Sequence, residues 1–100
     1  MVIVGGFFEL EPDQREDFLG SRHDMIRQSR AEPGCLEYHF GADPIDPGRV
    51  VLFERWADQE SLDAHLSAQR AAPPSTDDPI VPKAVSITVY DIAGERSLRG

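Results

Sequence analysis

The chain has 100 residues, the usual length of one domain, and 40% of them are hydrophobic, which is enough for one compact core. Ten Lys and Arg against eighteen Asp and Glu give a formal net charge of −8. Because this charge repels phosphate backbones and anionic lipid surfaces, the composition excludes nucleic acid and membranes as expected partners.

Cysteine content and the first residues indicate the compartment. Cys35 is the only cysteine, so the chain forms neither an internal disulfide nor a cysteine-rich metal site. The apolar stretch Met1–Phe8 is too short for a membrane span and lacks the basic start of a signal peptide. We therefore expect a cytoplasmic protein.

The first predicted element is a strand over Val2–Leu10, which is rich in Val, Ile and Phe. Gly5 and Gly6 lie inside it and indicate either a bulge or a place where another group approaches the backbone closely.

A helix is predicted next, because Asp13 followed by Glu16 has the spacing of a capping box. It should end near Ala31, ahead of a Pro-Gly pair. Six residues form its expected inward stripe: Phe18, Leu19, Arg22, Met25, Ile26 and Ser29.

Two strands follow, over Cys35–Ala42 and Arg49–Trp56, joined by a loop dense in turn-forming residues. Alternation in the first of them places Glu37 and His39 on one face. The residues expected on the opposite face are Leu36, Tyr38 and Phe40.

A second helix is predicted from its cap Asp58 to about Ala71, and a last strand over Lys83–Ile92. The stretch between them, Ala72–Pro82, contains four prolines and is expected to be a loop. The helix should direct one stripe inward: Leu62, His65, Leu66 and Gln69.

The order β-α-β-β-α-β predicts an α+β, ferredoxin-like split βαβ fold with an antiparallel sheet, over residues 1–93, followed by a C-terminal tail over 94–100. Val50–Phe53 is apolar on both faces of its strand, and two helices cover only one face of a sheet. The apolar patch left on the other face predicts a homodimer.

Three ordered motifs carry a family resemblance: Glu32–Tyr38 (EPGCLEY), Phe53–Asp58 (FERWAD) and Leu62–Leu66 (LDAHL). They resemble those of the antibiotic biosynthesis monooxygenase (ABM) domain family over about residues 1–70. The resemblance implies a dimeric α+β barrel, with a pocket between sheet and helices in each subunit. The family includes cofactor-free oxygenases of quinols and anthrones, haem-degrading enzymes, isomerases and members of no known activity.

The haem-degrading members of this family use an Asn of the first strand with a Trp and a His of the second helix. This sequence contains no Asn, and its one Trp, Trp56, precedes that helix. Haem degradation by that arrangement is therefore not expected.

His65 and Glu54 are the candidate catalytic pair. His65 interrupts an apolar helix stripe, so its imidazole is either a buried structural group or a base that titrates near neutral pH. Glu54 is expected to fix the tautomer of His65 by accepting its N–H, a link that serves either interpretation.

Four further residues are candidates for binding an aromatic substrate: Trp56, Tyr38, Phe40 and Arg22. Core packing explains Trp56 equally well, and an arginine in such a stripe often extends to water. His23 and His39 are expected on the surface. Without paired metal-ligand spacing or a nucleotide fingerprint, neither a metal nor another cofactor is expected.

Together these features predict a cofactor-independent monooxygenase that reacts dioxygen with a quinol, anthrone or similar polycyclic phenol. An apolar pocket, a base and a cationic donor would suffice, because the substrate anion itself passes an electron to dioxygen. The alternative is a non-catalytic small-molecule-binding or structural domain, or a small isomerase of the same fold.

Overall fold

The structure is a computed structural model that describes residues 1–71 and 80–99. The chain forms four strands, three α-helices and one 3₁₀ helix in the following order: β1 (Val2–Glu9), η1 (Pro12–Gln14), α1 (Arg15–Ser21), α2 (His23–Ala31), β2 (Cys35–Ala42), β3 (Arg49–Trp56), α3 (Gln59–Ala71) and β4 (Ala84–Asp91). The order expected from the sequence is confirmed.

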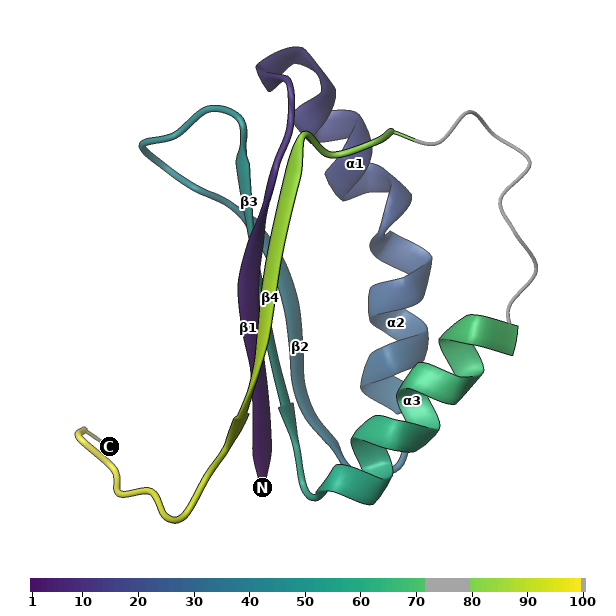
Figure 1. Ribbon diagram of the computed structural model, residues 1–100, viewed down its shortest axis with the longest axis vertical. Helices are drawn as coiled ribbons and strands as arrows, with labels where there is room; N and C mark the ends of the chain where they lie inside the picture. Colours follow the sequence, from purple (N-terminus) through teal and green to yellow (C-terminus); the bar gives the residue numbers. More distant parts are fainter. Residues whose placement is uncertain (72–79, 100) are drawn as a thin grey trace.

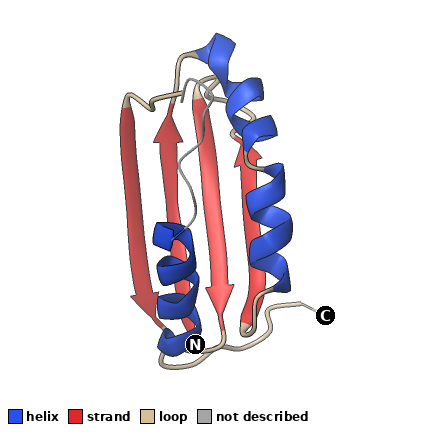
Figure 2. Ribbon diagram, turned by 90° about the vertical axis from the view of Figure 1, so that its right-hand side faces the viewer, coloured by secondary structure: helices blue, strands red, loops and turns tan. Residues whose placement is uncertain are grey.

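The strands form one antiparallel sheet in the order β2-β3-β1-β4, and the helices lie on one of its faces (Figures 1 and 2). This is the expected α+β, ferredoxin-like arrangement. Among the described helices, none is long and apolar enough to cross a membrane.

The first predicted helix is divided, which corrects the sequence expectation. No side-chain capping bond forms at Asp13; instead Pro12 opens a short 3₁₀ turn, and α1 begins only at Arg15. The helix is interrupted at Arg22, whose ψ is −8°. Gly20 weakens the helix there, and the Ser21 hydroxyl donates to the Phe18 carbonyl oxygen at 2.6 Å.

The second helix begins as expected, because the Asp58 carboxylate accepts the Ser61 backbone N–H at 2.8 Å. The proline-containing stretch expected to form a loop, Ala72–Pro82, lies largely outside the described residues.

Gly5 and Gly6 mark a close approach rather than a bulge. β1 pairs without a register shift with both β3 and β4. A Cβ atom at Gly6 would collide with the backbone oxygen of Ser86 on β4. Only a glycine allows this contact between the strands.

The bulge lies instead in β2, between Cys35 and Glu37. It leaves Leu36 unpaired with β3 and 48% exposed, so the expectation that Leu36 shares an inward face with Tyr38 and Phe40 is wrong. A bulge adds one residue and thereby shifts the alternation that precedes it.

The core lies between the sheet and the helices. It contains two adjoining clusters of buried residues, one around Trp56 and one around Phe18. The opposite, outer face carries apolar side chains that no described helix covers: Val51 at 43% exposed, Phe53 at 37% and Tyr90 at 52%.

Candidate functional site

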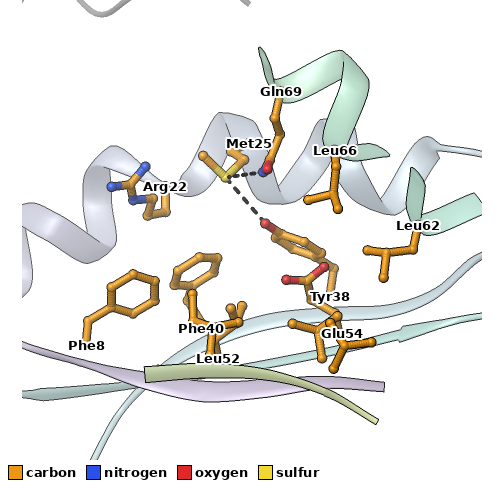
Figure 3. A pocket seen from close by; sticks show the side chains of 13 residues that line it. Phe8, Arg22, Met25, Tyr38, Phe40, Leu52, Glu54, Leu62, Leu66 and Gln69 are labelled. Carbon is orange, nitrogen blue, oxygen red and sulfur yellow. Dashed lines mark hydrogen bonds between the residues drawn. The ribbon is translucent and has the colours of Figure 1, made fainter. Parts of the chain in front are cut away.

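A cavity of about 260 Å³ lies between the sheet and the helices α2 and α3. Most of its walls are apolar, and Figure 3 shows Phe8, Phe40 and Leu52 along the sheet side with Leu62 and Leu66 on α3. Four polar side chains reach it, and each comes from a different part of the chain: Arg22, Tyr38, Glu54 and Gln69. The cavity therefore presents few polar groups in an apolar surrounding, as small-molecule sites do.

Tyr38 projects from β2 toward α2 and is 2% exposed. Its hydroxyl donates to the Met25 sulfur at 3.4 Å, and the Gln69 amide donates to the same sulfur at 3.5 Å (Figure 3). Burial, followed by the nearby Glu54 carboxylate, raises the pKa of Tyr38 to about 12. At neutral pH this group is therefore a phenol that donates a hydrogen bond.

Glu54 lies on β3 with a side chain only 7% exposed, and its carboxylate lies beside the Tyr38 ring (Figure 3). Its Oε1 accepts the Trp56 indole N–H at 3.0 Å. Burial raises the pKa of Glu54, while the hydrogen bond from Trp56 opposes that rise, as does the charge of His65 whenever its imidazole is protonated. A carboxylate that burial makes more basic is suited to accept a proton from a bound ligand.

His65 on α3 is buried, and its closest carboxylate differs from the one expected. Its Nδ1 lies 3.2 and 3.1 Å from the two carboxylate oxygens of Glu32, whereas its Nε2 lies 3.9 Å from Glu54 Oε1. The expected hydrogen bond between His65 and Glu54 is therefore not formed, and Glu32 takes that place. The imidazole also packs on the Trp56 ring, with 4.7 Å between centroids.

Arg22 reaches the cavity from the interruption between α1 and α2, and its guanidinium carbon lies 4.6 Å from the Phe18 ring centroid. Its Nε is buried and has no hydrogen-bond partner among the described residues. Desolvation lowers the pKa of Arg22, yet a guanidinium remains charged at neutral pH. An anionic oxygen of a ligand would satisfy this N–H.

The six residues predicted from the sequence separate into two groups. Those that line the cavity are Arg22, Tyr38, Phe40 and Glu54. His65 and Trp56 do not line it. Trp56 is fully buried and hydrogen-bonded to Glu54, so the expectation that its ring forms a cavity wall is wrong. His23 and His39 are exposed, as expected.

Three residues with a place in this site were not singled out by the sequence as site residues. Met25 and Gln69 are on the predicted inward stripes, so helical periodicity already indicated their direction. Glu32 immediately follows α2, and no local pattern connects it with His65, 33 residues away. Within residues 1–71 and 80–99, no group of His, Cys, Asp and Glu is suited to hold a metal ion.

Comparison with known proteins identifies a family and several relatives. The family model "Antibiotic biosynthesis monooxygenase" matches residues 1–72. An uncharacterized Synechocystis protein, sll1783, is 30% identical over 100 residues, which cover 97% of this chain and 67% of the relative. Rv0793 of Mycobacterium tuberculosis, named "putative monooxygenase", is 38% identical over 64 residues, which cover 64% of this chain and 62% of that protein.

The solved structures agree in fold. The structure of Rv0793 superposes with a TM-score of 0.71 at 31% identity, covering 96% of this chain and 98% of that one. The haem degrader MhuD of the same organism, solved with two haems in its active site, gives a TM-score of 0.72 over 97% of this chain and 100% of that one. At 13% identity, the likeness to MhuD concerns the fold alone.

Proposed function

The chain belongs to the antibiotic biosynthesis monooxygenase family, and from this premise we propose that it is a cofactor-independent monooxygenase acting on a quinol, an anthrone or a similar polycyclic phenol. One observation carries the proposal: the buried Glu54 carboxylate lines an apolar cavity that also receives Arg22 and the Tyr38 hydroxyl. A base and two donors in an apolar site are what ionisation of a phenol or anthrone requires.

The proposed reaction begins when Glu54 accepts a proton from the bound substrate. Arg22 and Tyr38 then stabilise the oxygen that carries the negative charge. The electron-rich anion passes an electron to dioxygen, and the two radicals combine at the substrate carbon. For an anthrone, the methylene group becomes a carbonyl that keeps one oxygen atom, and the other oxygen leaves as water with the two hydrogens. The substrate supplies all four electrons, so the reaction needs no external reductant.

The name of Rv0793 supports an oxygenase and indicates no substrate. Haem is a poorer candidate substrate, because the chain lacks the Asn that the haem-degrading arrangement of this family uses. The cavity's phenol, guanidinium and carboxylate instead favour a ligand with an ionisable oxygen.

We place the functional unit in a homodimer whose subunits meet through the outer face of the sheet. Val51, Phe53 and Tyr90 on that face are between 37% and 52% exposed in the single chain. A second copy would remove these apolar side chains from water, which is the strongest force for association.

Oxygen uptake tests the proposed activity. Metal-free and flavin-free protein is mixed with anthrone and, separately, with a substituted hydroquinone, and dioxygen is followed with an electrode. We expect uptake well above the buffer rate, lowered about 10²- to 10⁴-fold in Glu54→Gln. Glu60→Gln, an exposed acidic residue of α3 outside the cavity, is the control and should match the parent protein. Binding of these compounds without oxygen uptake would instead favour the non-catalytic binding domain.

A further inference from the structure

Two carboxylates lie on either side of the buried imidazole of His65. Glu54 lines the cavity, and Glu32 lines a separate hollow on the protein surface. The His65 side chain is 2% exposed, that of Glu54 is 7% exposed and that of Glu32 is 27% exposed. The three groups thus lead from the interior of the cavity to a place that water reaches.

We propose that Glu54, His65 and Glu32 form a proton path through which a proton taken from the bound substrate leaves for bulk water. The inference rests on the proposed function, because a base that removes a proton in a water-poor cavity must release it before the next turnover. Glu32, which does not line the cavity, forms the outer end of this path.

The hydrogen bonding of His65 supports this direction of transfer. Nδ1 lies within 3.2 Å of both Glu32 oxygens, a distance at which an N–H donates to a carboxylate. With its proton on Nδ1, the neutral imidazole has an unprotonated Nε2, and Nε2 is the nitrogen on the Glu54 side. Glu32 therefore positions the imidazole so that its accepting nitrogen faces the protonated form of Glu54.

The transfer itself conserves protons at each step. Substrate O–H or C–H gives its proton to Glu54, and the Glu54 carboxyl then donates to His65 Nε2. The imidazolium gives its other proton, on Nδ1, to Glu32, and Glu32 releases it to water. The ring is then left with its proton on Nε2, so each turnover also requires its return to the Nδ1–H form, by ring rotation and proton exchange, before Nε2 accepts again. The 3.9 Å between Nε2 and Glu54 Oε1 is about 1 Å longer than a hydrogen bond, and such distances often shorten when ligand binds.

The ionisable groups placed against the imidazole are Glu32, Tyr38 and Glu54, and Cys35 lies close enough to both carboxylates to be affected by their charges. Tyr38 meets His65 edge-on, with 5.4 Å between ring centroids, and its pKa of about 12 keeps the phenol protonated at neutral pH, so it does not take up the proton. Burial and then the charges of Glu32 and Glu54 raise the pKa of the Cys35 thiol, which keeps it protonated. The two carboxylates are the remaining acceptors among these groups.

The first experiment needs no substrate. Long-range ¹H–¹⁵N spectra of the ligand-free protein at neutral pH show which imidazole nitrogen of His65 carries the proton. We expect a neutral ring with the proton on Nδ1. In Glu32→Ala the proton should move to Nε2, because Glu54 is then the nearer acceptor, whereas Glu60→Ala in the same surface hollow should leave it on Nδ1. A parent protein protonated on Nε2, or on both nitrogens, would overturn the proposal, and so would an unchanged tautomer in Glu32→Ala.

The second experiment follows proton transfer without oxygen chemistry. Anthrone is incubated with the protein in anaerobic heavy water, and deuterium entering its methylene group is measured by mass spectrometry. We expect Glu32→Ala to slow repeated exchange at least about tenfold while anthrone affinity stays unchanged. Added formate, which can replace the missing carboxylate at the surface, should restore the rate, and Glu60→Ala should match the parent protein.

The two experiments separate the path from the proposed function. If the parent protein does not exchange the anthrone proton above the buffer rate, the proposed activity fails, and the tautomer of His65 alone decides whether the path is oriented as inferred. If the parent protein exchanges and Glu32→Ala exchanges equally fast, the path is overturned and the proposed activity stands.

Discussion

The Trp56 indole N–H donates a 3.0 Å hydrogen bond to Glu54 Oε1, two residues earlier on the same face of β3. Through this contact a fully buried tryptophan holds a carboxylate at the wall of an apolar cavity. A buried carboxylate without such a partner is strongly destabilising. The tryptophan thus acts on the cavity through Glu54.

Replacing Glu54 by Gln should change how stability depends on pH. Because burial raises the pKa of Glu54, its contribution to stability is greatest below the ordinary carboxyl value of 4.5 and is lost as the pH rises through the folded-state pKa. Glu54→Gln, which keeps an oxygen for the Trp56 N–H, should remove that loss. The melting temperature of the variant relative to the parent protein should therefore increase between acidic and neutral pH, and a constant difference would contradict this expectation.

Tyr38 should ionise only under strongly alkaline conditions. The sequence has two tyrosines, so Tyr90→Phe leaves Tyr38 as the only phenol. Ultraviolet titration of that variant should show that Tyr38 ionises with a pKa of about 12, or that it ionises abruptly at the pH where the protein unfolds. Circular dichroism measured at the same pH values separates the two cases. Ionisation near pH 10, the usual range for tyrosine, would show that the phenol is not buried as described.

Arg22 should contribute to ligand binding more than to stability. Its buried Nε has no partner among the described residues, so Arg22→Met should leave the melting temperature unchanged or raise it. The same variant should weaken binding of a phenolate or anthrone enolate about 10- to 100-fold, the effect of losing a hydrogen bond to a charged group. Isothermal titration provides both affinities. Arg22→Lys keeps the positive charge but lacks the paired N–H donors of a guanidinium. Its ligand affinity should therefore lie between that of the parent protein and that of Arg22→Met.

A charge on the outer face of the sheet should prevent association. Phe53→Glu places a carboxylate beside Val51 in the surface proposed to meet a second copy. Light scattering should then give 11.1 kDa for the variant and twice that mass for the parent protein. Ile45→Glu is the control, because Ile45 is 89% exposed in the loop between β2 and β3 and should not affect the mass. A parent protein of 11.1 kDa at micromolar concentration would remove the dimer from the proposed function.

The sequence determined the order of strands and helices because those elements depend on neighbours a few residues apart. Strand alternation predicted that Tyr38 and Phe40 lie on the inner face of the sheet. Helical spacing predicted that Arg22 and Leu62 lie on the inward faces of their helices. Asp58 identified the start of α3 by its own capping bond. Consequently, four of the six predicted site residues lie at the cavity: Arg22, Tyr38, Phe40 and Glu54.

Only the tertiary structure decided which of these groups meet. Glu32 and His65 are 33 residues apart, and they approach because the end of α2 and the middle of α3 lie on the same face of the sheet (Figure 1). Trp56 shares a strand face with Glu54 in any straight strand, yet α3 decides that its ring is buried against His65 instead of forming a cavity wall. The bulge at Leu36 likewise has no signal in the alternation of strand residues. Contacts between distant segments reflect how whole elements fill a common core, and that is a property of the assembled chain.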